Sequence, residues 1–377
     1  MKIKTPWRAV AAMFFLNGAL IGAWGSRIPS FVAEFDLTPL ALGLLLLCIA
    51  LGALVGFPLA GRMSDERGAA LSSLVLGGVY VLSLLLIPFA PTIAVLALCL
   101  AFFGFAHGAQ DVTMNAWAAE VEKHMGRAVM SSFHAVWSFG AGAGALSGWV
   151  AIKFGLSTET HFVFLSLAVG AIFLPLGNIG WQSPRTVKEN GPRFALPKGG
   201  LLLVGLVAFS TTVGEGAMLD WSALVLHDAK NVSEAQAPLG YFVFSVAMVA
   251  TRLAGSIIVQ AIGPVNAVRM SGASALVGAV IVLISTSLPV ALVGFVFFGL
   301  GYAMIVPLAF SRAASDPDVP PGRAIASVAA LGYSGILVGP PLIGFVAQLT
   351  SLNGSLVLLA ILGAVTVALA WTLKPVS

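Results

Sequence analysis

The chain has few charged residues and almost no cysteine. Only 9% of its 377 residues are charged, against 59% that are hydrophobic, so it lacks the polar surface that a water-soluble fold of this length requires. Its lysines and arginines form no run interleaved with aromatic residues, which argues against a nucleic-acid partner. The two cysteines, Cys48 and Cys99, lie in separate apolar segments without metal-ligand spacing. We interpret them as small core residues.

Motifs of enzymes are also missing from the sequence. There is no phosphate-binding loop, no metal-ligand cluster and no nucleophile elbow, so we expect neither an enzyme nor a bound metal or cofactor. An ATP-binding domain is equally absent from the sequence. We therefore do not expect this chain to use ATP as a source of energy.

Long apolar stretches are what the sequence has in abundance. A membrane-spanning helix needs about 20 mostly apolar residues. Because the first stretch runs to about Phe31 without a small-residue cleavage site, we interpret it as a retained span rather than a signal peptide. The sequence predicts an all-α membrane protein with twelve transmembrane helices, at roughly 7–31, 38–61, 69–89, 92–116, 128–151, 160–180, 200–226, 236–262, 266–286, 289–312, 323–349 and 353–373.

The spans divide into two similar halves. The longest polar interruption, residues 181–199, separates an N-terminal six-helix bundle (1–180) from a C-terminal one (200–377). Trp24 and Gly43 recur as Trp221 and Gly240 with the same spacing, and residues 126–148 align with 322–344. A parallel six-helix repeat is typical of transporters with a site near the middle of the membrane, between pseudo-symmetric bundles.

Basic residues fix the expected orientation. Nearly all loop lysines and arginines fall on one side of the predicted spans, and only Lys153 and Lys230 lie in loops on the other. Because short basic loops stay in the cytoplasm, we expect both termini to be cytoplasmic.

The segment GRMSDERG, residues 61–68, resembles a signature of the major facilitator superfamily, placed after the second span. Gly61, Asp65 and Gly68 match it, whereas Glu66 and the two alanines after Gly68 stand where the family usually has basic residues. The resemblance extends over essentially the whole chain and implies the major facilitator fold. It also implies a cytoplasmic latch in which Asp65 accepts from helix-end amides or from an arginine, with Arg67 and Arg127 as candidates.

Within that superfamily, QDVTMNAW resembles the fourth span of fucose permease-like sugar/proton symporters. On this match Asp111 takes the place of the protonatable acid and Asn115 that of the symporters' asparagine, while Gly25 stands near the place of their first-span aspartate. The resemblance to bacterial relatives implies the bacterial inner membrane. The proline of the drug/proton antiporter signature is missing from the fifth span, so we interpret its glycines as a packing face: Gly140, Gly144 and Gly148.

A polar stripe interrupts the fourth span. His107, Asp111 and Asn115 are four residues apart and share one helix face, with Gln110 beside them. Because an ionised carboxylate costs about 2.5–3.5 kcal/mol at the centre of a membrane helix, the stripe must face a cavity or another helix. It is either a site for protons and substrate or a structural hydrogen-bond clamp to the fifth span. His134 on that span could pair with Asp111 or share its proton.

Glu215 lies about 15 residues into the seventh span, near the middle of the membrane. Between Gly214 and Gly216 we expect the helix to be broken, which would expose backbone groups to a substrate. Arg252 in the eighth span either binds substrate or neutralises Glu215 in a static pair.

Two further sets of residues complete the predicted site. Arg27 and Asp220 lie near the outer ends of the first and seventh spans, where they form either a gating ion pair or two separately snorkelling side chains. Trp24 shares a helix face with Asn17. The predicted substrate-binding residues are Asn17, Trp24, His107, Gln110, Asn115, Trp137, Arg252 and Tyr302, and the predicted proton-coupling residues are Asp111, Glu215 and His134.

These residues favour a proton-coupled transporter of a small polar solute such as a sugar or an organic acid. An efflux antiporter for amphipathic compounds would use the same acids in the opposite sense, and a sensor or assembly subunit that transports nothing is a third alternative. The expected partners are a small-molecule substrate, protons and the lipid bilayer, and we expect a monomer.

Overall fold

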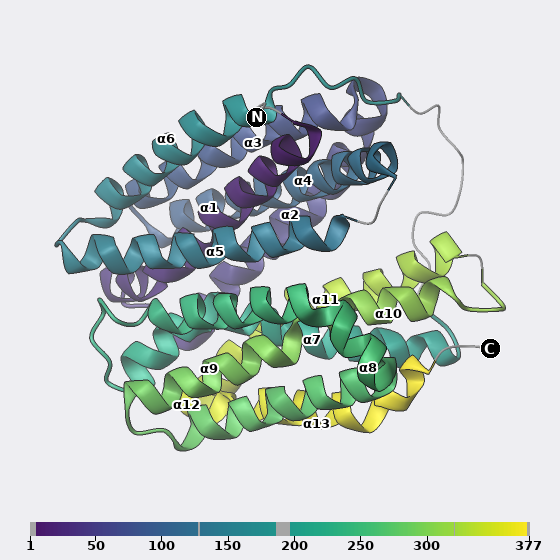
Figure 1. The fold of residues 1–377 in the computed structure, drawn as a ribbon. Helices are drawn as coiled ribbons and strands as arrows, with labels where there is room; N and C mark the ends of the chain where they lie inside the picture. Colours follow the sequence, from purple (N-terminus) through teal and green to yellow (C-terminus); the bar gives the residue numbers. More distant parts are fainter. Residues whose placement is uncertain (1–4, 127–128, 186–196, 320, 375–377) are drawn as a thin grey trace. The chain divides into compact units, whose positions relative to one another are not determined.

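The computed structural model describes residues 5–126, 129–185, 197–319 and 321–374, and within these ranges every regular element is a helix (Figure 1). The elements are α1 (Pro6–Phe35), α2 (Pro39–Arg67), α3 (Ala69–Leu86), η1 (Ile87–Phe89), α4 (Ile93–Met125), α5 (Met130–Lys153), α6 (Thr158–Gly177), α7 (Gly200–Leu224), η2 (Val225–Ala229), α8 (Leu239–Ile284), α9 (Leu288–Tyr302), α10 (Ile305–Ala314), α11 (Pro321–Leu349), α12 (Leu352–Ser355), α13 (Val357–Leu369) and η3 (Ala370–Leu373).

Eleven helical segments in the described part of the chain are long and apolar enough to cross a membrane. One of them, α8, has 46 residues, or about 69 Å at 1.5 Å per residue, more than twice the thickness of a bilayer core. Its helical geometry breaks at Gly263, where φ is 77°, just before Pro264. This break falls between the spans predicted at 236–262 and 266–286. The number of separate membrane-length helices is therefore eleven rather than the twelve predicted, because α8 joins two of the predicted spans.

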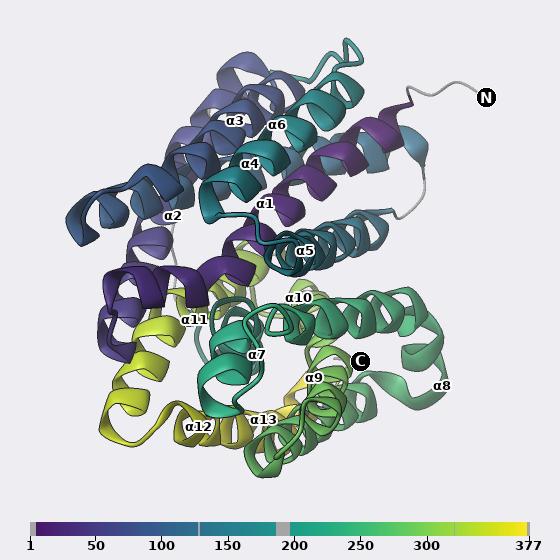
Figure 2. The same cartoon turned by 90° about the vertical axis from the view of Figure 1, so that its left-hand side faces the viewer.

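The chain forms two compact units. The first comprises residues 1–37, 44–189 and 233–242, and the second comprises residues 38–43, 190–232 and 243–377. In each unit the helices run alongside one another as a bundle (Figures 1 and 2). The exact boundaries of the two predicted bundles, with residues 181–199 as the linker, stay a prediction.

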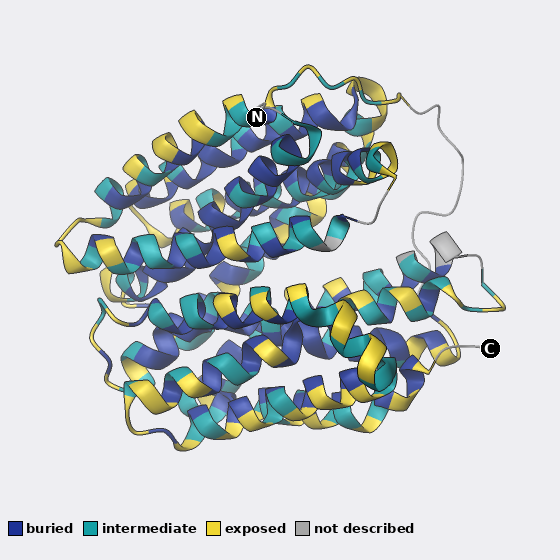
Figure 3. Ribbon diagram, in the orientation of Figure 1, coloured by how far each residue is buried: buried dark blue, intermediate teal, exposed yellow. Residues whose placement is uncertain are grey.

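The most extensive helix contacts follow the sequence repeat. They join α1 to α5 in the first unit and α7 to α11 in the second. α1 is almost wholly buried, whereas α2 and α6 leave much of their surface exposed, as the yellow and dark blue bands of Figure 3 show. Residues on α1 and α7 are therefore held by neighbours on several sides, which makes these helices suitable for positioning polar groups.

Glycines let α1 and α5 approach backbone to backbone. A Cβ atom on Gly140 or Gly144 would overlap the carbonyl oxygens of Phe15 or Ala19, and one on Gly148 would overlap Ser26 Oγ. The predicted packing face on the fifth span is therefore confirmed. Between helices in lipid there is no hydrophobic driving force, so close packing of this kind stabilises their association.

The α1–α5 contact makes Gly22 intolerant of substitution. Its Cβ would overlap the Ala141 backbone, and rigid backbone cannot move aside as a side-chain tip can, so we expect Gly22→Ala to destabilise the protein by about 1–3 kcal/mol or more. Gly78 in α3 is a matched control, because a Cβ there would meet no atom within 4 Å beyond its chain neighbours and the local helix backbone. Thermal unfolding in detergent should show a clear loss for Gly22→Ala and almost none for Gly78→Ala. Equal unfolding temperatures would contradict the close packing.

Two predicted elements differ in the structure. Residues 61–67 are not a loop but the last turns of α2, and only Gly68, with φ 88°, leaves the helix. The i,i+4 pair of Arg62 and Glu66, 2.6 Å apart, supports these turns. The span predicted at 289–312 is interrupted after Tyr302, where α9 ends and α10 begins at Ile305.

The N-terminus of α5 is held by a carboxylate from α4. Oε2 of Glu122 accepts hydrogen bonds of 2.7 Å from the backbone N–H groups of both Val129 and Met130. These amides have no acceptor within their own helix. A negative charge near the N-terminus of a helix also interacts favourably with the helix dipole, which is positive at that end. Glu122 therefore fixes the start of α5 relative to α4, the two helices that carry His134 and the polar stripe.

Candidate functional site

In the first unit, polar side chains from α1, α4 and α5 meet at Asn17. Trp137 Nε1 donates to Asn17 Oδ1 at 2.7 Å, and Asn17 Nδ2 donates to Gln110 Oε1. Gln110 Nε2 in turn donates to the Met13 carbonyl at 3.4 Å. Asn17 and Gln110 are both completely buried. The structure thus brings three predicted substrate-binding residues together, and ties two of them into the core.

This network has a measurable structural effect. Asn17→Ala would leave the fully buried side-chain carbonyl of Gln110 and the partly exposed N–H of Trp137 without their partner. An unsatisfied buried group costs about 1–3 kcal/mol, and a partly exposed one costs less. We therefore expect a loss of roughly 2–4 kcal/mol in the free energy of unfolding. The exposed Asn266, whose amide donates to Ile262 O at 3.0 Å, provides the control Asn266→Ala. If both variants unfold at the same temperature as the native chain, the network is not a determinant of stability.

His107 turns toward α3 rather than toward Gln110. Its Nδ1 lies 3.1 Å from the hydroxyl of Tyr80, and the two rings are 5.3 Å apart. Tyr80 is fully buried, so its hydroxyl needs this partner. Tyr80 was not among the residues predicted from the sequence. The sequence feature that could have identified it is a phenol in the middle of a mostly apolar span.

Asp111 and Asn115 interact along their own helix. Asn115 Nδ2 donates to the Asp111 carbonyl at 2.9 Å and to its carboxylate Oδ1 at 3.2 Å. Both residues are partly exposed. The polar stripe therefore divides, with Gln110 facing α1, His107 facing α3, and Asp111 bonded within α4.

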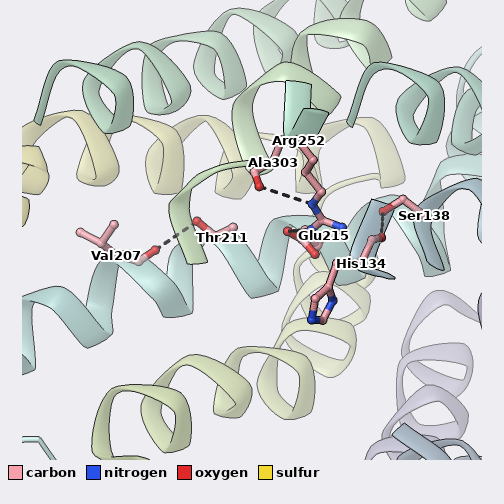
Figure 4. Close-up of polar contacts among 7 residues, drawn as sticks. All are labelled: His134, Ser138, Val207, Thr211, Glu215, Arg252 and Ala303. Atoms are coloured by element: carbon pink, nitrogen blue, oxygen red, sulfur yellow. Dashed lines mark hydrogen bonds and ion pairs between the residues drawn. The ribbon is translucent and has the colours of Figure 1, made fainter. Parts of the chain in front are cut away.

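His134 lies on α5, where its ring packs edge-on against Phe14 at 5.4 Å. Its carbonyl accepts from Ser138 Oγ at 3.1 Å (Figure 4). The predicted pairing of His134 with Asp111 stays a prediction.

Trp24 is part of the core of the first unit. It is 1% exposed and its ring lies 5.3 Å from Phe31 and 6.3 Å from Phe103. Its indole N–H has no hydrogen-bond partner among the described residues. The ring thus packs between aromatic side chains of α1 and α4 in the core of this unit.

Arg27 is buried and anchored to the start of α6. Its Nη2 donates to the carbonyl of Leu156 at 2.7 Å, and its Nε donates to His161 Nδ1 at 3.3 Å. On the far side of the imidazole, Nε2 lies 2.9 Å from Ser147 Oγ on α5. Arg27 therefore connects α1, α5 and α6 within its unit. Asp220, its predicted gating partner, is partly buried on α7, and the gate stays a prediction.

In the second unit, Glu215 and Arg252 form an ion pair inside the membrane-length segments. Arg252 Nη2 lies 3.4 Å from Glu215 Oε1, and the side chains are 12% and 25% exposed. Figure 4 shows Arg252 reaching from α8 to Glu215 on α7. The contact that the static-pair alternative requires is therefore present, while binding of substrate by Arg252 stays a prediction. The expected helix break at 214–216 is wrong, because α7 is continuous from Gly200 to Leu224.

The glycines beside Glu215 have other roles than breaking the helix. A Cβ on Gly214 would overlap the phenol ring of Tyr302, so this glycine makes room for the aromatic side chain. A Cβ on Gly216 would meet no atom within 4 Å beyond its chain neighbours and the local helix backbone, so no packing contact requires a glycine there. Tyr302 is itself only 3% exposed, and its hydroxyl has no hydrogen-bond partner among the described residues.

A proline places a second acceptor beside Arg252. In an unbroken helix the Ala303 carbonyl would accept from the N–H of residue 307, but that residue is proline and has no N–H. Ala303 O instead accepts from Arg252 Nε at 3.4 Å (Figure 4). The break between α9 and α10 thus provides an anchor for the guanidinium. This function of Pro307 was not predicted from the sequence, although the missing i,i+4 donor signals it.

Residues 10–321 match the family model described as Major Facilitator Superfamily. The chain belongs to this superfamily. It is 43% identical to "Uncharacterized transporter y4wD" of Sinorhizobium fredii over 99% of both chains. It is 33% identical to "Membrane protein MosC" of Rhizobium meliloti, over 96% of this chain and 88% of the relative.

Solved structures of the same fold agree with this assignment. A point mutant of the nucleoside transporter NupG has a TM-score of 0.76 at 13% identity, and the match covers 98% of this chain and 99% of the NupG chain. A D-xylose-proton symporter has the same TM-score at 16% identity, and the match covers 98% of this chain and 97% of the symporter. The chain is thus a multi-pass membrane transporter of the Major Facilitator Superfamily and not an enzyme.

The superfamily signature lies at the C-terminal end of α2. Asp65 and Arg67 are both exposed there, and neither side chain has a hydrogen bond or ion pair within the described ranges. Arg127, the other candidate for the latch, lies outside the described residues. Gly68 serves a separate purpose, since its Cβ would come within 2.8 Å of the Ser183 side chain.

Proposed function

We propose that the chain is a secondary active transporter that moves a small polar solute, of the sugar or organic acid type, across the bacterial inner membrane by alternating access and in symport with protons. The observation that carries this proposal is the Glu215–Arg252 pair. A carboxylate and a guanidinium lie in membrane-length apolar helices and remain partly exposed. Ionisable groups at such positions are costly and generally serve transport.

The proposed roles follow from chemistry and position. Glu215 and Asp111 bind and release protons, and His134 assists Asp111. The solute contacts polar and aromatic groups, namely Asn17, Trp24, His107, Gln110, Asn115, Trp137, Arg252 and Tyr302. Arg27 and Asp220 form the outer gate, and Asp65 with Arg67 or Arg127 forms the cytoplasmic latch.

Both termini lie in the cytoplasm in this proposal. A reporter enzyme that is active only in the periplasm, fused to the C-terminus, tests this orientation, and we expect the fused reporter to be inactive.

Similar solved structures are compatible with this substrate class. They include a nucleoside transporter and a D-xylose-proton symporter, whose solutes are small and polar. At such low sequence identity they support the fold, and the choice of solute rests on the polar groups of this chain.

Uptake by the purified chain in proteoliposomes tests the proposal. With an inward proton gradient, one solute from a panel of sugars, organic acids and amphipathic cations should accumulate, and a protonophore should abolish the accumulation. Proton-driven expulsion of an amphipathic compound would instead identify an efflux antiporter. Accumulation that survives the protonophore would contradict proton coupling.

A further inference from the structure

Arg252 is held from two sides by partners of different kinds. Nη2 faces the carboxylate of Glu215 at 3.4 Å, while Nε donates to the carbonyl of Ala303 at 3.4 Å. The carbonyl acceptor exists because Pro307 cannot donate to it, and a carbonyl does not titrate. The guanidinium therefore keeps one anchor when the charge on Glu215 changes, and its position is fixed in both protonation states.

Protonation of Glu215 alters the charge of this site by one unit. The ionised pair is neutral overall, whereas a protonated Glu215 leaves the guanidinium charge without its carboxylate. Loss of this counter-charge beside a guanidinium in this environment is unfavourable. A second carboxylate in the same place would restore the balance, and a guanidinium binds carboxylates through its fork of N–H donors.

Building on the proposed function, we infer that the transported solute is a small organic anion whose carboxylate takes the place of Glu215 on Arg252. A proton from the water phase binds a carboxylate oxygen of Glu215. The solute carboxylate then accepts the N–H groups of Arg252 that Glu215 has released. On the other side of the membrane the solute leaves, Glu215 loses its proton to water and pairs with Arg252 again. One proton and one negative charge cross together, so this step moves no net charge.

The pair is accessible to a ligand and its contact is weak. Glu215 is 25% exposed, and a Cβ at Gly216, the next residue of α7, would meet no atom within 4 Å beyond its chain neighbours and the local helix backbone. The pair itself is long and is not the tight two-pronged contact that an arginine and a carboxylate can form. An incoming carboxylate would therefore replace a weak contact by a stronger one.

Few other titratable groups act on Glu215 in this unit. Arg252 is the charge that acts on it from α8, and the buried phenol of Tyr302 is its titratable neighbour from α9. On α10, Arg312 pairs with Asp316 at 3.3 Å. The described side chains of α11 add only Tyr333, and α12 and α13 carry no titratable residue. Asp220 lies five residues further along α7.

Thermal unfolding of the full chain in detergent tests the inference with formate, the smallest carboxylate. In Glu215→Gln, which imitates the protonated acid, sodium formate should raise the unfolding temperature saturably, by a few degrees. Sodium chloride at equal ionic strength and formamide, a neutral molecule of the same shape, should not. The double variant Glu215→Gln/Arg252→Gln should lose the formate effect. Equal effects of the three additives, or a formate effect that persists in the double variant, would overturn the inference.

A second measurement uses the native chain and covers the case in which Glu215→Gln does not fold. The inference requires that Glu215 takes up a proton at a pH at which formate is still ionised, so the stabilisation by formate should grow as the pH falls from neutral. A formate effect that is independent of pH would overturn the inference.

Failure of this inference can be told apart from failure of the proposed function. Glucose, glucuronate and glucosamine share one ring and differ in charge, so they can be compared in the proteoliposome assay. Proton-driven uptake of glucose, without any effect of formate at Arg252, would contradict the inference that the solute is an organic anion. It would leave the proposed proton symport supported. Absence of proton movement with every solute tested would instead contradict the proposed proton-coupled function.

Discussion

Glu215→Gln is expected to abolish proton-driven accumulation of the solute while downhill exchange continues. Glutamine preserves the volume of the side chain but cannot bind and release a proton. One pH unit across the membrane supplies about 1.4 kcal/mol per proton, or about tenfold accumulation. We expect that factor to disappear in proteoliposomes that contain the variant, whereas equilibrium exchange of labelled solute persists.

The control for this prediction is Glu66→Gln. Glu66 pairs with Arg62 at the exposed end of α2, so its loss should leave accumulation unchanged. Accumulation by Glu215→Gln at the native level would show that another group couples the proton. Loss of exchange together with accumulation would show instead that the carboxylate is needed for binding or folding.

Asp111→Asn is expected to reduce accumulation strongly and to leave stability nearly unchanged. The described hydrogen bonds of Asp111 come from Asn115 on the same helix, to the carbonyl and to Oδ1. An asparagine at position 111 retains both acceptors, so the local structure of α4 should persist. What it loses is a titratable proton. Accumulation assays combined with thermal unfolding would separate the two roles that the sequence left open for this stripe.

Asn115→Ala is the matched variant for Asp111→Asn. It removes the amide donor and keeps the carboxylate, so accumulation should remain above that of Asp111→Asn. If Asp111→Asn transports normally but unfolds at a markedly lower temperature, Asp111 is a structural clamp and not a proton carrier.

The positions of the helices were predictable from hydropathy, and so was the polar pair in the second unit. Long apolar stretches report directly on the bilayer, and a carboxylate in the middle of a span needs a partner, for which Arg252 was a candidate. The break at Gly263 was also placed correctly between two predicted spans. These features depend on the local composition of the chain, so they can be predicted from the sequence without knowing how the helices pack.

Features that depend on contacts between helices could not be predicted in the same way. The contact of Asn17 and Gln110 with solute stays a prediction; what the sequence could not show is that these two side chains bond to each other, because the choice of partner depends on helix rotation. The glycines around Glu215 suggested a break, but Gly214 is required by the ring of Tyr302 on α9. The role of Pro307 was accessible in principle, since a missing N–H always leaves a carbonyl to be satisfied.

Proton counting on the purified native chain decides whether solute binding is coupled to Glu215. The protein is placed in weakly buffered detergent solution with a pH-sensitive dye, and the solute that accumulates in proteoliposomes is added. We expect proton uptake by the native chain on solute binding, and no uptake by Glu215→Gln at the same occupancy. Solute binding by the native chain without any change in bound protons would contradict the coupling of transport to Glu215.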